Sequence, residues 1–190
     1  MRGILYLTLI AALSAALSGC VAVVAGGAAT GALIADDRRK AGVYLEDEEI
    51  ELHGMNRIHE LFPQASVSVS ITSYNRNVLL TGQAPDEPTK SKVEESIKNI
   101  AKVRTVYDEI TISGVPSLTS EANDSAITTK IKARLLDGKG VNFNHVKVVT
   151  EAGVVYLMGL LTHAEAEEAA QVAAKTGGVV RVVKVVEYID

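Results

Sequence analysis

The sequence is poor in the residues on which several classes of function depend. It has one cysteine, no tryptophan and only 4% aromatic residues among 190 positions. A single cysteine excludes an internal disulfide framework and a zinc site built from several thiolates. The scarcity of aromatic side chains argues against nucleic-acid binding by base stacking. Because the formal net charge is −4, affinity for an anionic partner requires a local basic patch.

The sequence contains no recognisable catalytic or cofactor-binding motif. Its four histidines form no HExxH motif, and the glycine pairs at 26–27 and 177–178 lack the Lys-Ser/Thr continuation of a phosphate loop. No serine lies in a Gly-x-Ser-x-Gly elbow. The acidic run at 46–49 lacks the spacing of a calcium loop and favours a helix N-terminus instead. We therefore expect a protein that is not an enzyme and has no cofactor or metal.

The N-terminus has the pattern of an export signal. Arg2 precedes an apolar run from Ile4 to Leu17, which is shorter than the roughly 20 residues of a spanning helix. The run closes with Leu17-Ser18-Gly19-Cys20, which resembles a bacterial lipobox. We expect a signal peptide at 1–19 and lipidation of Cys20, an ordinary signal peptide being the alternative. Because several acyl chains anchor a protein stably, a lipidated chain would stay attached to a membrane. The residue after Cys20 is Val21, and not the Asp that resembles an inner-membrane retention signal, so we expect transport to the outer membrane.

The rest of the chain repeats one pattern at a separation of about 76–77 residues. The apolar stretch that ends at Gly82 matches the one that ends at Gly159, and each is followed by a helical and then a β-branched segment. The order in each half is helix, strand, strand, helix, strand. Helices are expected at about 47–61, 87–101, 124–136 and 163–176, and strands at 67–72, 78–81, 106–112, 146–150, 154–158 and 182–189. Asp86 is expected to cap one helix, and Thr162 with Glu165 has capping-box spacing.

This repeat resembles the BON domain, a small module of bacterial envelope proteins. The resemblance rests on the strand-glycine steps at Gly82 and Gly159, the alanine-rich second helix and the valine-rich last strand. It implies an α+β fold of two tandem BON domains, each a three-stranded mixed sheet covered by two helices. We expect a lipidated tether at 20–43, the domains at 44–113 and 123–190, and a linker at 114–122. The order of a lipobox followed by two such domains resembles the domain order of outer-membrane lipoproteins of this family.

The helix expected at 124–136 is the candidate binding element. Ile127, Ile131 and Leu135 recur at helical spacing and should face the core. Lys130 and Arg134 flank this stripe. The family resemblance implies that this helix contacts anionic phospholipid; a solvated helix face is the alternative. Relatives carry tryptophan where this chain has Ala126, so we expect weaker insertion and more dependence on charge. The predicted lipid-binding residues are Ala126, Ile127, Lys130, Ala133 and Arg134.

Charge distinguishes the two halves. Residues 36–113 contain 10 basic and 14 acidic side chains, against 8 and 9 in residues 114–190. An anionic lipid surface would repel the first half and tolerate the second. With the resemblance, this predicts a periplasm-facing outer-membrane lipoprotein that binds phosphatidylglycerol or cardiolipin and maintains envelope integrity, with a role at division sites. The alternative is a protein-interaction module recruited to envelope-assembly or cell-division machinery. Nucleic acid is not expected as a partner.

Overall fold

The computed structural model describes residues 37–63, 67–114, 118–138 and 140–190. The expected signal peptide, Cys20 and most of the tether lie outside these ranges, as does part of the expected linker. Residues 37–190 form one compact unit. None of the described helices is both long and apolar enough to cross a bilayer.

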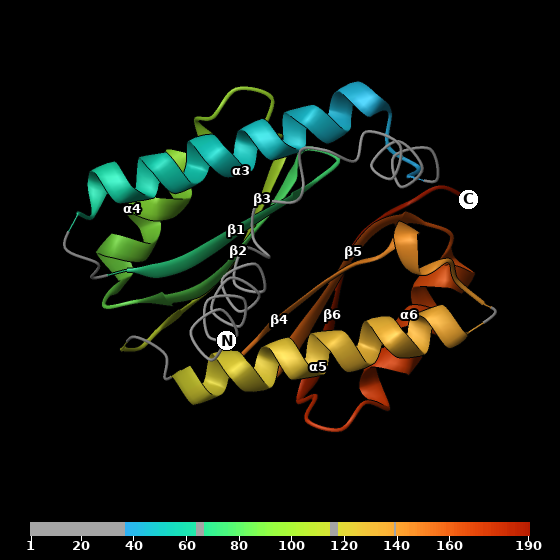
Figure 1. Ribbon diagram of the computed structural model, residues 1–190. Coiled ribbons are helices and arrows are strands. Elements are labelled where there is room, and N and C mark those ends of the chain that lie inside the picture. Colours follow the sequence, from blue (N-terminus) through green and yellow to red (C-terminus); the bar gives the residue numbers. More distant parts are fainter. Residues whose placement is uncertain (1–36, 64–66, 115–117, 139) are drawn as a thin grey trace, which may run out of the picture. The chain divides into compact units, whose positions relative to one another are not determined.

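The two repeats have the predicted order of elements (Figure 1). The first comprises α3 (Ala41–Leu61), β1 (Ser68–Tyr74), β2 (Asn77–Ala84), α4 (Glu87–Lys98) and β3 (Thr105–Ile112). The second comprises α5 (Leu118–Asp137), the 3-10 turn η1 (Phe143–His145), β4 (Lys147–Glu151), β5 (Val154–Leu161), α6 (His163–Ala174) and β6 (Arg181–Tyr188). The short η1 turn has no counterpart among the predicted elements.

Each repeat builds a three-stranded sheet with its second strand in the centre. β1 pairs with β2, and β4 with β5, as antiparallel hairpins. β3 and β6 return after a helix and pair in parallel with the central strands. The predicted mixed sheets are thereby confirmed, because a crossover helix brings the third strand back in the direction of the second.

Two of the predicted helix caps are present. The Asp86 carboxylate accepts a hydrogen bond from the Thr89 amide at 2.8 Å. Thr162 and Glu165 form a complete capping box at the start of α6. These contacts satisfy amide groups that have no partner within the first turn of a helix.

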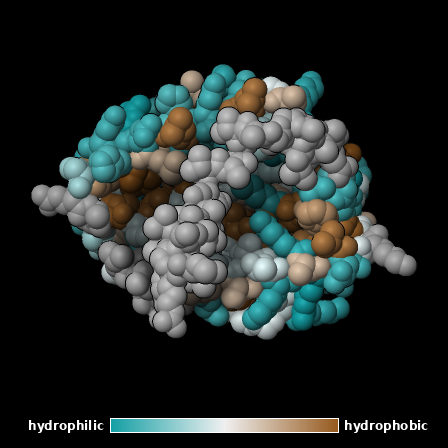
Figure 2. Space-filling view, viewed as in Figure 1, coloured by the Kyte–Doolittle hydropathy of each residue, from teal (hydrophilic) through white to brown (hydrophobic). Residues whose placement is uncertain are grey.

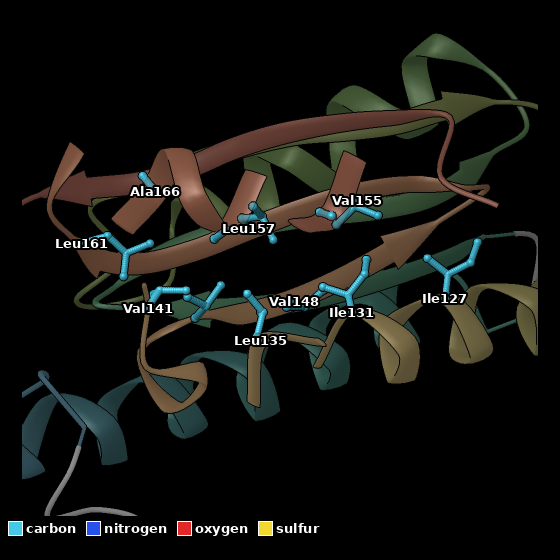
Figure 3. Packing of buried hydrophobic residues seen from close by; sticks show 12 residues of the cluster. Ile127, Ile131, Leu135, Val141, Val148, Val155, Leu157, Leu161 and Ala166 are labelled. Atoms are coloured by element: carbon cyan, nitrogen blue, oxygen red, sulfur yellow. The ribbon is translucent and has the colours of Figure 1, made fainter. Parts of the chain in front are cut away.

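Each pair of helices covers one face of its own sheet. α3 and α4 pack on the first sheet around Ile50, Val93 and Ile97. α5 and α6 pack on the second sheet, where Ile127, Ile131 and Leu135 are 0–2% exposed. Figure 3 shows these three side chains pointing from α5 toward the sheet residues Val148, Val155 and Leu157. The core stripe predicted for this helix is therefore confirmed.

The opposite faces of the two sheets pack against each other. A third apolar cluster joins Tyr74 and Leu79 of the first sheet to Tyr156, Met158 and Val185 of the second. Polar contacts surround it, such as the hydrogen bond from Gln83 Nε2 to Glu151 Oε1 at 2.7 Å. Because helices cover only the other faces, α3 and α5 belong to opposite outer layers of this unit (Figure 1).

Candidate functional site

A buried carboxylate fixes α5 to the hairpin of its own sheet. Asp124 is 8% exposed, and it accepts hydrogen bonds from the amides of Ala152 and Gly153 at 2.8 and 2.9 Å. These two residues have φ angles of 49° and 76°, as the two-residue turn between β4 and β5 requires. The contact sets the position of α5 against the sheet, so that the helix presents a defined face to solvent.

The first repeat contains the same contact between a buried aspartate and a hairpin turn. Asp47 lies 77 residues before Asp124. It is 1% exposed and accepts hydrogen bonds from the amides of Asn75 and Arg76 at 2.8 and 2.7 Å. Sequence reasoning placed both aspartates at helix starts and missed this role. The signal that could have found it is the recurrence of Asp at the repeat spacing.

The outward surface of α5 is built from small and apolar side chains with a basic edge. We define the outer face of α5 as the exposed residues that lie opposite its core stripe. They are Ala122, Ala126, Thr129, Ala133, Leu136 and, as the last residue of the helix, Asp137. Lys130 is exposed beside this face, and Leu136 is 62% exposed. The predicted residues Ala126, Lys130 and Ala133 are thus brought together on one surface.

The other two predicted binding residues lie elsewhere. Ile127 is fully buried, so it supports the helix from beneath and does not reach the outer face. Arg134 donates hydrogen bonds to the Lys175 carbonyl at 2.8 Å and to Thr176 Oγ1 at 3.3 Å. It therefore holds the C-terminal end of α6, where a cation also meets the negative end of the helix dipole.

The corresponding helices of the two repeats differ sharply in charge. α3 contains six acidic residues and one arginine, whereas α5 contains three acidic and three basic residues. At the repeat spacing of 77, Glu49 corresponds to Ala126 and His53 to Lys130. From Ala122 to Leu136, α5 exposes three cationic side chains and no carboxylate, because its one acid in this range, Asp124, is turned inward.

The segment that precedes α3 is fastened to both repeats. The Arg38 guanidinium donates to both carboxylate oxygens of Glu165, each at 2.7 Å, and to the Leu160 carbonyl at 2.9 Å. This contact is the main reason why the pKa of Glu165 falls to about 2. The side chain of Arg39 is 7% exposed and pairs with Asp37 and Asp47 at 2.6 and 2.8 Å. The described end of the expected tether, residues 37–40, is thus held to both repeats by ion pairs.

Metal binding finds no support in the part of the chain that the structure describes. No group of three or more His, Cys, Asp or Glu side chains there is placed to hold an ion.

Comparison with known protein families identifies the family to which the chain belongs. The family model of the BON domain matches residues 56–114 and 123–190. The chain therefore belongs to the BON-domain family, with two copies of the domain, as the repeat predicted.

Proteins that are similar over most of the chain indicate which kind of BON-domain protein it is. The chain is 37% identical over 175 residues to the outer membrane lipoprotein DolP of Haemophilus influenzae, covering 92% of this chain and 91% of that protein. It is 38% identical over 161 residues to a 21 kDa hemolysin of Actinobacillus pleuropneumoniae, covering 81% and 80%. To osmotically-inducible protein Y of Escherichia coli it is 27% identical over 143 residues, covering 74% and 71%. The chain is accordingly a DolP-like outer-membrane lipoprotein.

Proposed function

We propose that this lipoprotein is anchored by acyl chains on Cys20, faces the periplasm and binds anionic phospholipid through the outer face of α5. Phosphatidylglycerol and cardiolipin are the expected lipids. The proposed role is non-enzymatic: the second BON domain holds to the membrane surface and supports envelope integrity, including at division sites. The observation that carries this proposal is the charge contrast between α3 and α5, two helices with the same place in the repeat.

The physical basis is electrostatic attraction with shallow apolar contact. Each basic side chain near an anionic membrane surface contributes roughly 1 kcal/mol. Lys130 stands beside the alanine-rich outer face of α5, whose small side chains let the helix approach the lipid headgroups closely. Leu136 adds an exposed apolar side chain. Since α5 carries no aromatic residue, binding should depend mainly on charge and weaken as salt rises.

The vesicle test uses the mature chain from residue 20 with Cys20→Ser, which removes the lipid anchor and isolates the contribution of α5. Lys130→Glu changes the local charge by two units without touching a buried residue. At roughly 1 kcal/mol per charge, co-sedimentation with phosphatidylglycerol–cardiolipin vesicles should weaken about 10- to 30-fold. Binding to phosphatidylcholine vesicles should stay low for both proteins.

The matched control is Lys92→Glu, which makes the same charge change at an exposed position of α4. It should leave vesicle binding nearly unchanged. Arg134 is unsuitable as the test position, because its substitution would also remove the hydrogen bond to the Lys175 carbonyl at the end of α6. If the Lys130→Glu protein binds anionic vesicles as well as the unsubstituted chain does, α5 is not the lipid site. If neither protein binds, recruitment by envelope-assembly or division proteins becomes the better account.

A further inference from the structure

An apolar stripe lies on the solvent side of α3. Leu45, Leu52 and Met55 are 64%, 54% and 54% exposed. They occur at positions i, i+7 and i+10, and therefore lie along one side of the helix. Figure 2 shows hydrophobic side chains among hydrophilic ones over α3. We call these three residues the α3 stripe.

The fold does not require these apolar residues. At the repeat spacing of 77, their counterparts on α5 are Ala122, Thr129 and Lys132. The second repeat builds the same helix on the same kind of sheet with those side chains. Isolated apolar residues on a surface are ordinary, but three large ones in line on one helix are characteristic of a contact surface.

Exposed carboxylates lie near the α3 stripe. Glu48 and Glu49 are exposed between Leu45 and Leu52, and Glu60 is exposed five residues after Met55, round the helix from it. Within the described residues, neither Glu48 nor Glu60 forms an ion pair with a cation. A groove of about 390 Å³ lies between α3 and the loop after α4. Its wall contains Glu46, Glu49 and Glu60 together with the cations Arg57 and Lys102, and Lys102 pairs with Glu46 and Glu49 at 3.4 and 3.3 Å. The surface therefore combines exposed apolar area with two carboxylates, Glu48 and Glu60, that have no ion-pair partner among the described residues.

We propose that the α3 stripe and its flanking glutamates bind an amphipathic helical segment of a protein partner, whose apolar side chains are bordered by Lys or Arg. Opposite charge at the rim would set the orientation and speed the encounter. An anionic membrane would be repelled by these carboxylates. A second copy of the chain would place like charges opposite each other across a two-fold axis. The proposal does not rest on lipid binding, since α3 and α5 belong to opposite outer layers.

The test measures binding of a labelled synthetic helical peptide by fluorescence anisotropy. The probe peptide has a leucine stripe flanked by lysines, and the comparison peptide has glutamates in place of those lysines. The protein is the full mature chain with Cys20→Ser. It should bind the lysine peptide, more weakly as salt rises, and bind the glutamate peptide at least about tenfold less well.

The key variant replaces the three residues of the α3 stripe with the corresponding residues of α5: Leu45→Ala, Leu52→Thr and Met55→Lys. Because the second repeat folds with these residues, the variant should fold, and it should bind the lysine peptide at least about tenfold less well. Glu48→Ser with Glu49→Ala, again the counterpart residues, should weaken binding and flatten its salt dependence. The control, Ile112→Thr with Val180→Thr, removes exposed apolar groups from other parts of the unit and should bind normally.

Four results would overturn the proposal: absence of lysine-peptide binding, equal binding of both peptides, unchanged binding by the key variant, or self-association that the key variant abolishes. Vesicle binding by the α3 variants separates this proposal from the function of α5. It should stay as in the unsubstituted chain, and its loss would show instead that the α3 stripe is a lipid contact. Conversely, Lys130→Glu should leave peptide binding intact.

Discussion

Glu151 is half-buried at the rim of the contact between the two sheets. Burial raises its pKa, and the nearby carboxylates of Asp124 and Glu121 raise it further. Its partner Gln83 donates one hydrogen bond to it, yet the Oε1 atom of Gln83 is buried and accepts none from the described residues. An ionised carboxylate can only accept hydrogen bonds, so it cannot satisfy that oxygen.

Glu151→Gln should therefore stabilise the protein. The new amide can accept from Gln83 and donate to its unpaired oxygen, which is worth about 1 kcal/mol at neutral pH. The pKa of Glu151 is raised in the folded state above its usual 4.5. The unsubstituted protein therefore loses stability as pH rises from about 4.5 through the raised pKa, whereas the variant does not. Urea unfolding at about pH 4 and pH 7 checks this, because the gain should appear only at the higher pH. A variant that is less stable at pH 7 would contradict it.

Single residues also mark the limit of what could be predicted from the sequence. The burial of Ile127, Ile131 and Leu135 follows from their helical period alone. The contact of Arg134 with the end of α6 could not be predicted, because the two contacting residues are 41 positions apart and meet only when both helices dock on the same sheet. The grouping of Ala126, Lys130 and Ala133 followed from spacing, since it requires only that the segment be helical.

At the scale of the elements, the helix starts show where local signals fail. The sequence predicts helix starts near Asp47, where an acidic run favours a helix N-terminus, and near Asp124. The structure begins α3 at Ala41 and α5 at Leu118, inside the stretch expected to be linker. Both aspartates instead face the hairpin turns. That contact links residues far apart in the chain and has no local signature.

Asp124→Ala should cost about 2–3 kcal/mol of stability, because two amides of the β4–β5 turn would lose their acceptor away from water. Thermal or urea unfolding measures this cost, and amide exchange at Ala152 and Gly153 should accelerate. Ser125→Ala, at the exposed neighbouring position, is the matched control and should change stability by less than about 0.5 kcal/mol. Equal stability of the two variants would show that the turn does not depend on this carboxylate.

At the scale of the whole molecule, the two repeats meet through their sheets. Leu79 on one central strand, and Tyr156 and Met158 on the other, point away from the helices and into this contact. Their neighbours along the strands, such as Leu80 and Leu157, point toward the helices. Such apolar runs predict strands buried on both faces. They do not reveal what covers the second face, because that depends on the docking of two separately built sheets.

This arrangement gives the protein two outer surfaces of different chemistry. The outer face of α5 is neutral to basic, and that of α3 is acidic with exposed apolar residues. The central claim is that α5 lies on the anionic bilayer while α3 faces away from it.

Fluorescence quenching of a single label tests this claim most directly. Cys20 is the only native cysteine, so the Cys20→Ser chain accepts a bimane label at Ala133→Cys on α5 or at Asn56→Cys, the corresponding exposed position on α3. With phosphatidylglycerol–cardiolipin vesicles that contain a lipid-borne quencher, the account predicts strong quenching at position 133 and little at position 56. Equal quenching at both positions, or quenching at position 56 alone, would contradict it.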